Sequence, residues 1–445
     1  MAGIRRVPED VLEYYLYPLI CEDLNDEELF EYLEEQKDIY LAHLSHLLVD
    51  YIWQNEAFNL RPIPGNVSVP PHLYGSFNFG DNVEDEWFVV YLLCQLTKTF
   101  SGLLVRVHDS DQEFLLIESA EVLPKWLNPD TAENRVFLYN GDLHIIPIPE
   151  SPQDVDGLPL FTPTLPEAIN FTLQKAEDDL HFAHCFLPAG LAAILEQRPS
   201  LVAAGVNAFY YRSPDDLKAC RTFKYFRPGT RVMSRVKFTK CLYAQLVQQK
   251  FQPHRESGWI LPNSSNSKFK AHDLGMKLAH GFEIICSKSS QKSNQNNGTL
   301  DNFEVHNIRW ERFLSSLSNN GYFKGELQSS KHHTELLKKA QQYFKENIQS
   351  SQRHEDEDTG NLILTLLENT PYSIEEMRLK EINLPPPDDD SWLDISPDEV
   401  DDMIRSSGGK ISGTSPNPFD LSQMTESMKS FVDNISDYEG AEFPK

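Results

Sequence analysis

One group of side chains at helical spacing has the chemistry of a metal site. His181, His184 and Cys185 stand at positions i, i+3 and i+4 of a segment with helical periodicity, and imidazole and thiolate are ligands that zinc prefers. A zinc site would still need a fourth ligand, and isolated histidines on a half-buried helix are more often hydrogen-bonded core or surface groups. We therefore expect no metal.

Motifs for catalysis or cofactor binding are absent from the sequence. It contains no GxxxxGK[ST], no GxGxxG after a strand, no GxSxG, no HExxH and no EF-hand loop. These spacings place phosphates, nucleophiles or metals against the groups that activate them. The sequence predicts a protein that is not an enzyme and has no cofactor.

A basic run without acidic residues lies between Asp216 and Glu256. Aromatic residues are interleaved with it, and such a mixture can stack nucleic-acid bases while the charges contact phosphates. An acidic protein partner could bind the same charges. A solvated helix face without a binding role, with its aromatic residues in the core, would show the same pattern. We predict a partner-docking face made of Arg221, Lys224, Arg227, Arg231 and Arg235. Phe223, Tyr225, Phe226 and Phe238 are interleaved with the basic run that extends from Lys218 to Lys240.

An acidic segment surrounds one tryptophan at residues 385–402, PPPDDDSWLDISPDEVDD. The prolines favour an extended entry, and the successive aspartates keep it solvated. A helix start follows, with Ser396 as N-cap, Pro397 at the first helical position and Glu399 three residues after the cap. So short an amphipathic helix cannot bury its apolar face alone, so it docks either on the protein's own body as a latch or on another protein as a ligand. The predicted docking side chains are Trp392, Leu393, Ile395, Val400, Met403 and Ile404.

Two serines of this segment, Ser391 and Ser396, are predicted phosphorylation sites because each has an acidic residue three positions later. A phosphate on Ser396 would lie at the helix N-terminus, where amides and the helix dipole stabilise it. A phosphate on Ser391 would add to the repulsion among residues 388–390 and favour a basic partner.

Charge is strongly segregated along the chain. The formal net charge is −27, yet residues 205–345 hold twenty-three basic against ten acidic residues. Residues 1–40 hold twelve acidic against three basic residues, and residues 371–445 hold seventeen against six. Opposite charges attract over roughly 8 to 10 Å at physiological salt, so the acidic tail can mask the basic region.

Six widely spaced cysteines without a CxxC pair, and an N-terminus without an uninterrupted apolar core, predict an intracellular, reduced protein that lacks a secretory signal. No stretch reaches the roughly 18 apolar residues of a membrane span.

Periodicity predicts an α+β domain over residues 1–150. Residues 11–20, 26–51 and 84–100 have apolar residues at helical spacing. Short β-branched and aromatic runs follow, and Asn140-Gly141 is a strong two-residue hairpin signal. The predicted strands are LLVRVHD (103–109), EFLLIES (113–119), RVFLY (135–139) and LHIIPIP (143–149).

The rest of the chain divides into four further regions. Prolines predict a linker over residues 151–164, and successive helical segments predict a basic all-helical domain over residues 165–350. Residues 351–405 hold a helix and the acidic tryptophan motif, and residues 406–445 form a mostly disordered tail. The predicted fold class is an α+β N-terminal domain followed by a mainly α-helical domain and an acidic, largely disordered C-terminal segment.

Longer phrases along nearly the whole chain resemble the ecdysoneless family, also described in fungi as suppressors of a glycolytic-gene regulator defect. They are YIWQNEAFNL (51–60), GDNVEDEWFVVYLL (80–93), LPKWLNPDTAENRVF (123–137), HCFLPAGLAAILEQRP (184–199), FTKCLYAQLVQQKF (238–251), HDLGMKLAHGFEIICSK (272–288) and DDDSWLDISPDEVDDM (388–403).

The resemblance implies a non-enzymatic scaffold or assembly factor in cell-cycle progression, transcription and pre-mRNA splicing, shuttling between cytoplasm and nucleus. It implies as partners the large core protein of the U5 spliceosomal particle, a co-chaperone complex containing RuvB-like ATPases, and retinoblastoma-type proteins. The LxCxE strand that binds retinoblastoma-type proteins has only a near match at residues 19–23, within a predicted helix. Family members extend further with acidic, serine-rich sequence, so we expect phosphoserine docking sites beyond Lys445.

Two hypotheses remain open. The first is a protein-interaction adaptor that uses the basic face and the acidic motif. The second is a nucleic-acid-associated factor that binds RNA through the basic region, in which case affinity should fall by orders of magnitude between low and physiological salt.

Overall fold

The computed structural model of the chain describes residues 10–20, 24–66, 69–109, 123–128, 130–148, 173–292, 308–319, 321–326, 330–344 and 359–394. The chain divides into a unit that ends at Pro387 and a second unit that begins at Asp388. Within the first unit we distinguish a sheet lobe, residues 10–148, and a helical lobe, residues 173–292 and 359–387. The predicted strand at residues 113–119, the predicted linker and the predicted tail lie outside the described residues.

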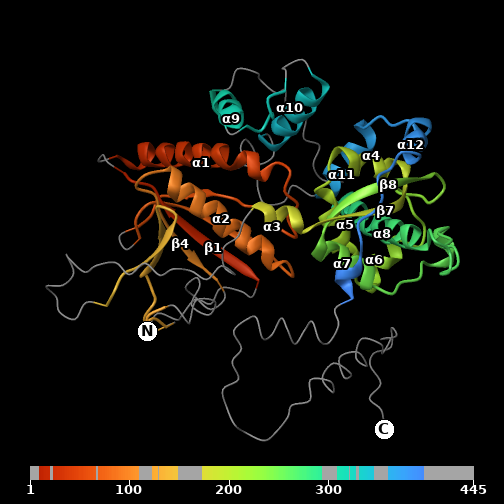
Figure 1. The fold of residues 1–445 in the computed structure, drawn as a ribbon, viewed down its shortest axis with the longest axis horizontal. Helices are drawn as coiled ribbons and strands as arrows, with labels where there is room; N and C mark the ends of the chain where they lie inside the picture. Colours follow the sequence, from red (N-terminus) through yellow and green to blue (C-terminus); the bar gives the residue numbers. More distant parts are fainter. Residues whose placement is uncertain are drawn as a thin grey trace, which may run out of the picture. The chain divides into compact units, whose positions relative to one another are not determined.

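The sheet lobe is built on a six-stranded antiparallel sheet (Figure 1). Its strand order is β2-β3-β1-β4-β5-β6, so β1 lies inside the sheet and pairs with both β3 and β4. The strands are β1 (Val11–Tyr17), β2 (Arg61–Ile63), β3 (His72–Asn78), β4 (Leu104–His108), β5 (Val136–Tyr139) and β6 (Asp142–Ile145). The predicted strands at residues 103–109, 135–139 and 143–149 are confirmed.

The helix predicted over residues 11–20 is wrong, because these residues form strand β1. Leu12, Tyr14 and Leu16 are fully buried at alternating positions. A run of seven residues satisfies both the helical and the strand period, so the hydrogen bonds offered by β3 and β4 decide the outcome. Pro18 then ends the strand, since it has no amide to continue the ladder.

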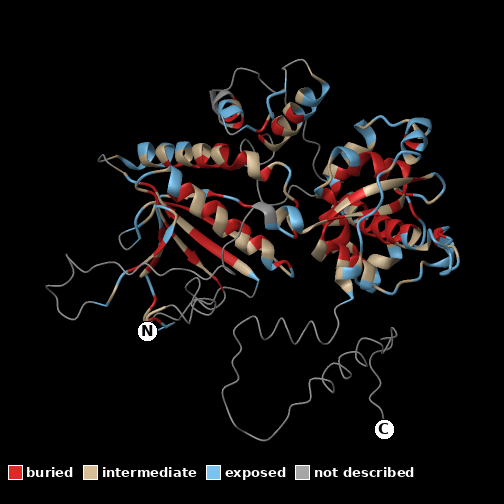
Figure 2. Cartoon of the chain, viewed as in Figure 1, coloured by how far each residue is buried: buried red, intermediate tan, exposed pale blue. Residues whose placement is uncertain are grey.

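Two helices cover one face of the sheet, α1 (Asp26–Leu48) and α2 (Val83–Thr99) (Figure 1). Both confirm the periodicity predictions. Helix α1 begins at a capping box, in which the Asn25 side chain accepts from the Glu28 amide and the Glu28 carboxylate accepts from the Asn25 amide. The buried residues gather on the inner sides of these helices and on the strands (Figure 2).

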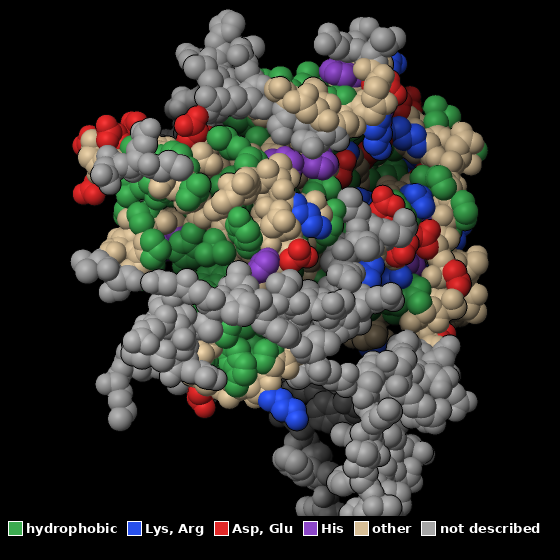
Figure 3. Space-filling view, turned by 60° about the vertical axis from the view of Figure 1, so that its left-hand side comes forward, with side chains coloured by type: hydrophobic (Ala, Val, Ile, Leu, Met, Phe, Trp, Pro, Cys, Tyr) green, Lys and Arg blue, Asp and Glu red, His purple; other side chains and the backbone are tan. Residues whose placement is uncertain are grey.

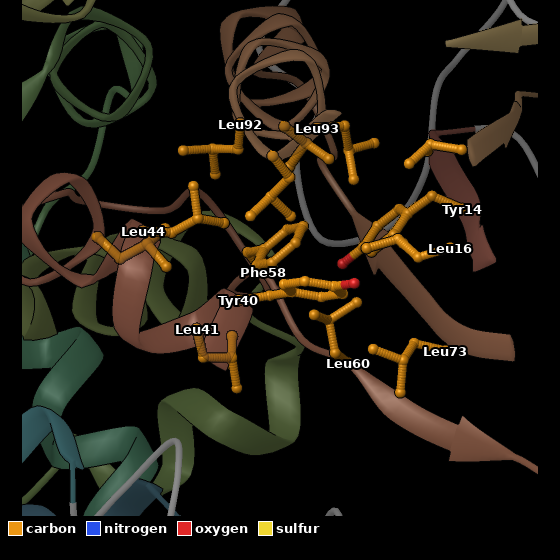
Figure 4. Packing of buried hydrophobic residues seen from close by; sticks show 14 of the residues in the cluster. Tyr14, Leu16, Tyr40, Leu41, Leu44, Phe58, Leu60, Leu73, Leu92 and Leu93 are labelled. Atoms are coloured by element: carbon orange, nitrogen blue, oxygen red, sulfur yellow. The ribbon is translucent and has the colours of Figure 1, made fainter. Parts of the chain in front are cut away.

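The core between sheet and helices is mainly leucine, with aromatic rings packed among the leucines (Figure 4). The rings of Tyr14 and Phe58 stack with centroids 5.1 Å apart, and the Tyr14 hydroxyl donates to the Asn59 carbonyl at 2.8 Å. Burial of the rings supplies apolar area, and the hydrogen bond removes the cost of burying the hydroxyl.

The hairpin predicted at Asn140-Gly141 is confirmed. Tyr139 pairs with Asp142, and both turn residues have positive φ, 52° for Asn140 and 83° for Gly141. This is the conformation that asparagine and glycine adopt at the lowest cost.

Two helices that the sequence grouped with the helical region pack instead into the core of the sheet lobe. They are α9 (Ile308–Asn319) and α10 (Lys331–Tyr343), and α9 lies against α1. Trp310, Phe313 and Phe344 are buried in that core, with the Phe313 and Phe344 ring centroids 5.2 Å apart.

The helical lobe is mainly helical, as predicted, but it is not all-helical. Strands β7 (Leu180–Pro188) and β8 (Arg231–Thr239) form an antiparallel pair within it. The helices are α3 (Leu173–Asp178), α4 (Ala189–Gln197), α5 (Leu201–Tyr210), α6 (Pro214–Ala219), α7 (Lys240–Gln248), α8 (Phe269–Lys292), α11 (Thr359–Asn369) and α12 (Ile374–Glu381), with short 3-10 turns at Arg255–Ser257 and, in the second unit, Ser391–Leu393.

Glycine allows two of these helices to touch. A Cβ added to Gly281 of α8 would lie 1.9 Å from the carbonyl oxygen of Gly205 in α5, so only hydrogen fits there. In the part of the chain that the structure describes, no helix has the length and apolar character needed to cross a membrane.

Candidate protein-interaction surface

The strand pair β7–β8 has one buried face and one outer face. His181, Ala183, Cys185 and Leu187 alternate along β7 and are buried. The residues between them share the outer face with their partners on β8, so that His184 lies opposite Arg235 and Phe182 opposite Lys237. Two of the predicted docking residues, Arg231 and Arg235, therefore lie on a strand face and not on a helix.

The guanidinium groups of these two arginines pack over aromatic rings. The Arg235 guanidinium carbon lies 3.7 Å from the Phe182 ring centroid, and that of Arg231 lies 5.0 Å from Phe186 and 5.1 Å from Trp259. A guanidinium over a ring face is attracted by the ring quadrupole. Both arginines are half-buried, so their positions are fixed by packing as well as by charge.

The loop between Cys220 and Arg231 is held by a buried carboxylate of α8. Glu283 is fully buried and accepts hydrogen bonds from the backbone amides of Lys224 at 2.6 Å, Tyr225 at 3.1 Å and Phe226 at 2.9 Å. Burial raises the pKa of Glu283, and the three amide donors oppose that rise. The contact orders the loop that carries most of the predicted docking face.

The other three predicted docking residues, Arg221, Lys224 and Arg227, lie on this loop and are exposed. The Arg227 Nε donates to the Phe223 carbonyl at 3.2 Å, and the Lys224 ammonium donates to the Tyr225 hydroxyl at 3.0 Å. The structure thus divides the predicted face into an exposed loop set and a packed strand set.

Most aromatics of the basic run belong to the core. Phe223, Phe226 and Phe238 expose 6%, 1% and 0% of their surface, whereas Tyr225 is half-buried. Stacking on nucleic-acid bases requires an accessible ring face. The interleaved aromatics that suggested such stacking are therefore mostly unable to supply it.

The chain leading to the acidic segment is anchored on the same strands. The Met233 amide donates to the Glu381 carboxylate of α12 at 2.6 Å. Downstream, the His184 Nε2 lies 2.7 Å from the Pro385 carbonyl oxygen, which an Nε2–H tautomer satisfies.

A pocket of about 370 Å³ lies beside the basic loop. Three segments far apart in the sequence line it: the start of α4, the loop before β8, and the connection from α11 to α12. Its lining residues are Pro188, Ala189, Gly190, Tyr225, Phe226, Arg227, Gly229, Thr230, Leu367, Tyr372 and Ile374.

The histidine and cysteine group is not a metal site. On a strand, His181 and Cys185 point into the core while His184 lies on the opposite face, so the helical spacing that would have joined them does not exist. Among the described residues no group of three or more His, Cys, Asp or Glu side chains is arranged to hold a metal ion.

The acidic motif is described as far as Asp394. Ser391–Leu393 form a 3-10 turn, and the Ser391 hydroxyl donates to the Asp389 carboxylate. Trp392 and Leu393 lie in this turn. Ile395, Ser396, Val400, Met403 and Ile404 lie outside the described residues.

A buried polar network joins the two lobes. No motif in the sequence predicted it. The Gln54 side-chain amide donates to the Gln245 side chain of α7 at 2.9 Å. The Gln54 backbone amide donates to the Asp85 carboxylate at 2.7 Å. The Tyr51 hydroxyl and the Asn82 side chain also donate to Asp85, each at 2.9 Å. Burial raises the pKa of Asp85 to about 7 despite these donors.

Basic side chains lie beside acidic ones on the face shown in Figure 3. Folding thus brings together some of the acidic and basic residues that are separated along the sequence. Lys288, for example, pairs with Asp216 at 2.8 Å. The exposed loop set lies in a stretch of sequence without acidic residues, between Asp216 and Glu256, and the buried Glu283 contacts its backbone.

These features define an α+β protein of two lobes with an ordered basic loop. A family model described as SGT1 protein matches residues 12–178 and 170–445. The chain belongs to this family, which includes the ecdysoneless proteins, and the resemblance predicted from the sequence is confirmed.

Similar proteins occur in distant eukaryotes. The chain is 33% identical to Protein ecdysoneless of Drosophila melanogaster over 98% of this chain and 69% of that protein. It is 30% identical to a Protein ecdysoneless homolog of Arabidopsis thaliana, over 89% of this chain and 67% of that one. A Dictyostelium discoideum homolog is 32% identical over 67% of this chain and 42% of its own length. No solved structure matches the chain.

Proposed function

We propose that the protein is a non-enzymatic adaptor that acts through protein–protein interactions in cell-cycle progression, transcription regulation and pre-mRNA splicing or ribonucleoprotein assembly. The observation that carries the proposal is the exposed basic set Arg221, Lys224 and Arg227 on a loop ordered by Glu283. An ordered loop loses little conformational entropy on binding, so its charges are available to an acidic protein surface.

The partners belong to the same proposal. They are the U5 spliceosomal core protein, the co-chaperone complex with RuvB-like ATPases, and retinoblastoma-type proteins, reached in the cytoplasm and the nucleus. Direct RNA binding is the weaker alternative, because Phe223, Phe226 and Phe238 are buried and cannot act as stacking platforms.

Charge reversal tests the proposal. A triple variant with Arg221→Glu, Lys224→Glu and Arg227→Glu should lose protein partners in affinity purification while the fold is retained, because the three side chains are exposed. The matched control reverses Lys125, Lys331 and Lys338, which are also exposed and lie in other segments. Retention of every partner by the first variant would refute the proposal.

A further inference from the structure

The pocket beside the basic loop indicates which kind of partner segment the protein binds. Its lining mixes apolar and polar groups, with Pro188, Leu367 and Ile374 among the apolar residues and Arg227 and Thr230 among the polar ones, and its volume of about 370 Å³ is near the lower end of ligand-binding pockets. Tyr372, which also lines it, exposes 46% of its surface. Such a site can take one bulky apolar side chain.

Hydrogen bonds connect the three segments that form the walls. The Ala189 amide donates to the Thr230 carbonyl at 3.0 Å, which joins the start of α4 to the loop before β8. The Thr370 hydroxyl donates to the Gln197 side chain at 2.9 Å, which joins the α11–α12 connection to the end of α4. The pocket is therefore formed before a ligand binds, and binding need not supply the cost of ordering it.

Charge around the pocket differs between its two sides. The loop side carries Arg227 in the lining and Lys224 and Arg221 nearby in the sequence, all exposed. The α12 side begins with the exposed acids Glu375 and Glu376. A ligand with negative charge would be attracted to the loop side and repelled from the α12 side.

We propose that this pocket binds a bulky apolar side chain, such as tryptophan, that is embedded in an acidic segment of a protein partner. The proposal rests on the proposed adaptor function and specifies the partner's chemistry. The apolar anchor contacts Leu367, Tyr372 and Ile374, and the flanking carboxylates contact the basic loop set.

Gly229 offers a way to block the pocket without disturbing the fold. It lines the pocket, its backbone φ is not in the left-handed region, and a Cβ added to it contacts nothing within 4 Å. Gly229→Trp should therefore place a large side chain at the pocket while leaving thermal unfolding unchanged. Ile260→Trp, at a side chain that is 79% exposed, is the matched control.

The probe is a fluorescein-labelled synthetic peptide with one tryptophan between two runs of four aspartates. We expect the full chain to bind it, and we expect about a tenfold loss of affinity in Gly229→Trp and for the same peptide with alanine in place of tryptophan. Ile260→Trp should bind as the wild type does.

Three results would overturn the proposal. The first is no measurable binding of the tryptophan peptide. The second is equal binding of both peptides by wild type and Gly229→Trp, with loss only in the triple charge-reversal variant, which would leave the adaptor function standing on the basic loop alone. The third is binding of a single-stranded RNA oligonucleotide in place of the peptide, abolished by Gly229→Trp.

Discussion

The guanidinium of Arg235 on β8 lies over the ring of Phe182 on the paired strand, 3.7 Å from its centroid. Arg235 was predicted as a docking residue, and its half-buried, ring-packed position gives it a share in holding β7 and β8 together. Residues of one basic run can thus differ in role, since Arg235 is packed within the fold. Arg221 of the same run is exposed, so substitutions at the two positions can be compared directly.

Arg235→Ala should lower the free energy of unfolding by roughly 0.5 to 2 kcal/mol, because it removes a partly desolvated cation–π contact and side-chain packing. Arg221→Ala should leave it unchanged, since that side chain is exposed. Chemical denaturation of the two variants measures the difference. Equal effects of both substitutions would contradict the distinction between strand set and loop set.

Glu283→Gln should loosen the basic loop. The carboxylate accepts from three successive amides, and an amide side chain offers only one acceptor oxygen and adds donors that face other donors. The expected loss is about 1 to 3 kcal/mol of stability, with faster hydrogen exchange at the amides of residues 224–226. Glu368→Gln, at an exposed acid of α11, is the control, and unchanged exchange at residues 224–226 in Glu283→Gln would show that the loop is ordered by other contacts.

Asp85 should make stability depend on pH. Its pKa is raised from 3.8 to about 7 by burial, with Asp179 adding to the rise, and Asp179 itself is raised to about 7 by burial and by Glu84. A carboxyl whose pKa is higher in the folded than in the unfolded state binds more protons when folded. The contribution of these two carboxyls to the free energy of unfolding therefore falls as pH rises from about 4 to about 7.

The slope should not exceed about 1.4 kcal/mol per pH unit for each carboxyl. Urea unfolding at pH values from 5 to 8 measures it. Asp85→Asn should flatten the profile and leave the contribution of Asp179, whereas Asp215→Asn, at an exposed acid, should keep the wild-type slope. Buried histidines with lowered pKa, such as His108 and His280, add the opposite slope below pH 6.5, so the test is the difference between the two proteins. If the stability of Asp85→Asn relative to wild type did not rise between pH 5 and 7, the sign of the Asp85 shift would be wrong.

Trp392→Ala should weaken partner binding, because a tryptophan side chain contributes a few kcal/mol when it is buried at an interface. Affinity purification beside Ile260→Ala, at a side chain that is 79% exposed, separates the motif from a general loss of apolar surface. Hydrogen exchange across residues 385–405 gives a second readout. Equal, rapid exchange in wild type, Trp392→Ala and partner-bound samples would argue against docking of this segment.

Phosphorylation at Ser391 should change the same segment. The Ser391 hydroxyl donates to Asp389, and a phosphate would replace that bond with repulsion. Ser391→Glu is expected to strengthen binding to a basic partner, and Ser391→Ala to leave it at the unphosphorylated level. Binding measured at two salt concentrations checks this, since an added charge contact should increase the salt dependence.

The sequence by itself determined the elements whose signals are local. Helices α1 and α2, the hairpin at Asn140-Gly141 and the mainly helical character of the later region are all encoded in windows of a few residues, as spacing of apolar side chains or as turn chemistry. The family resemblance likewise came from the sequence, because many phrases spread along the chain agree.

Only the tertiary structure decided what depends on distant partners. Residues 11–17 and 180–188 became strands because other strands paired with them, and that pairing separated His184 from His181 and Cys185. Glu283 holds amides that lie 57 to 59 residues earlier in the chain, and Gln54 bonds Gln245 across 191 residues. No local pattern contains such contacts, since the free energy of burying a polar group depends on which donors the fold brings to it.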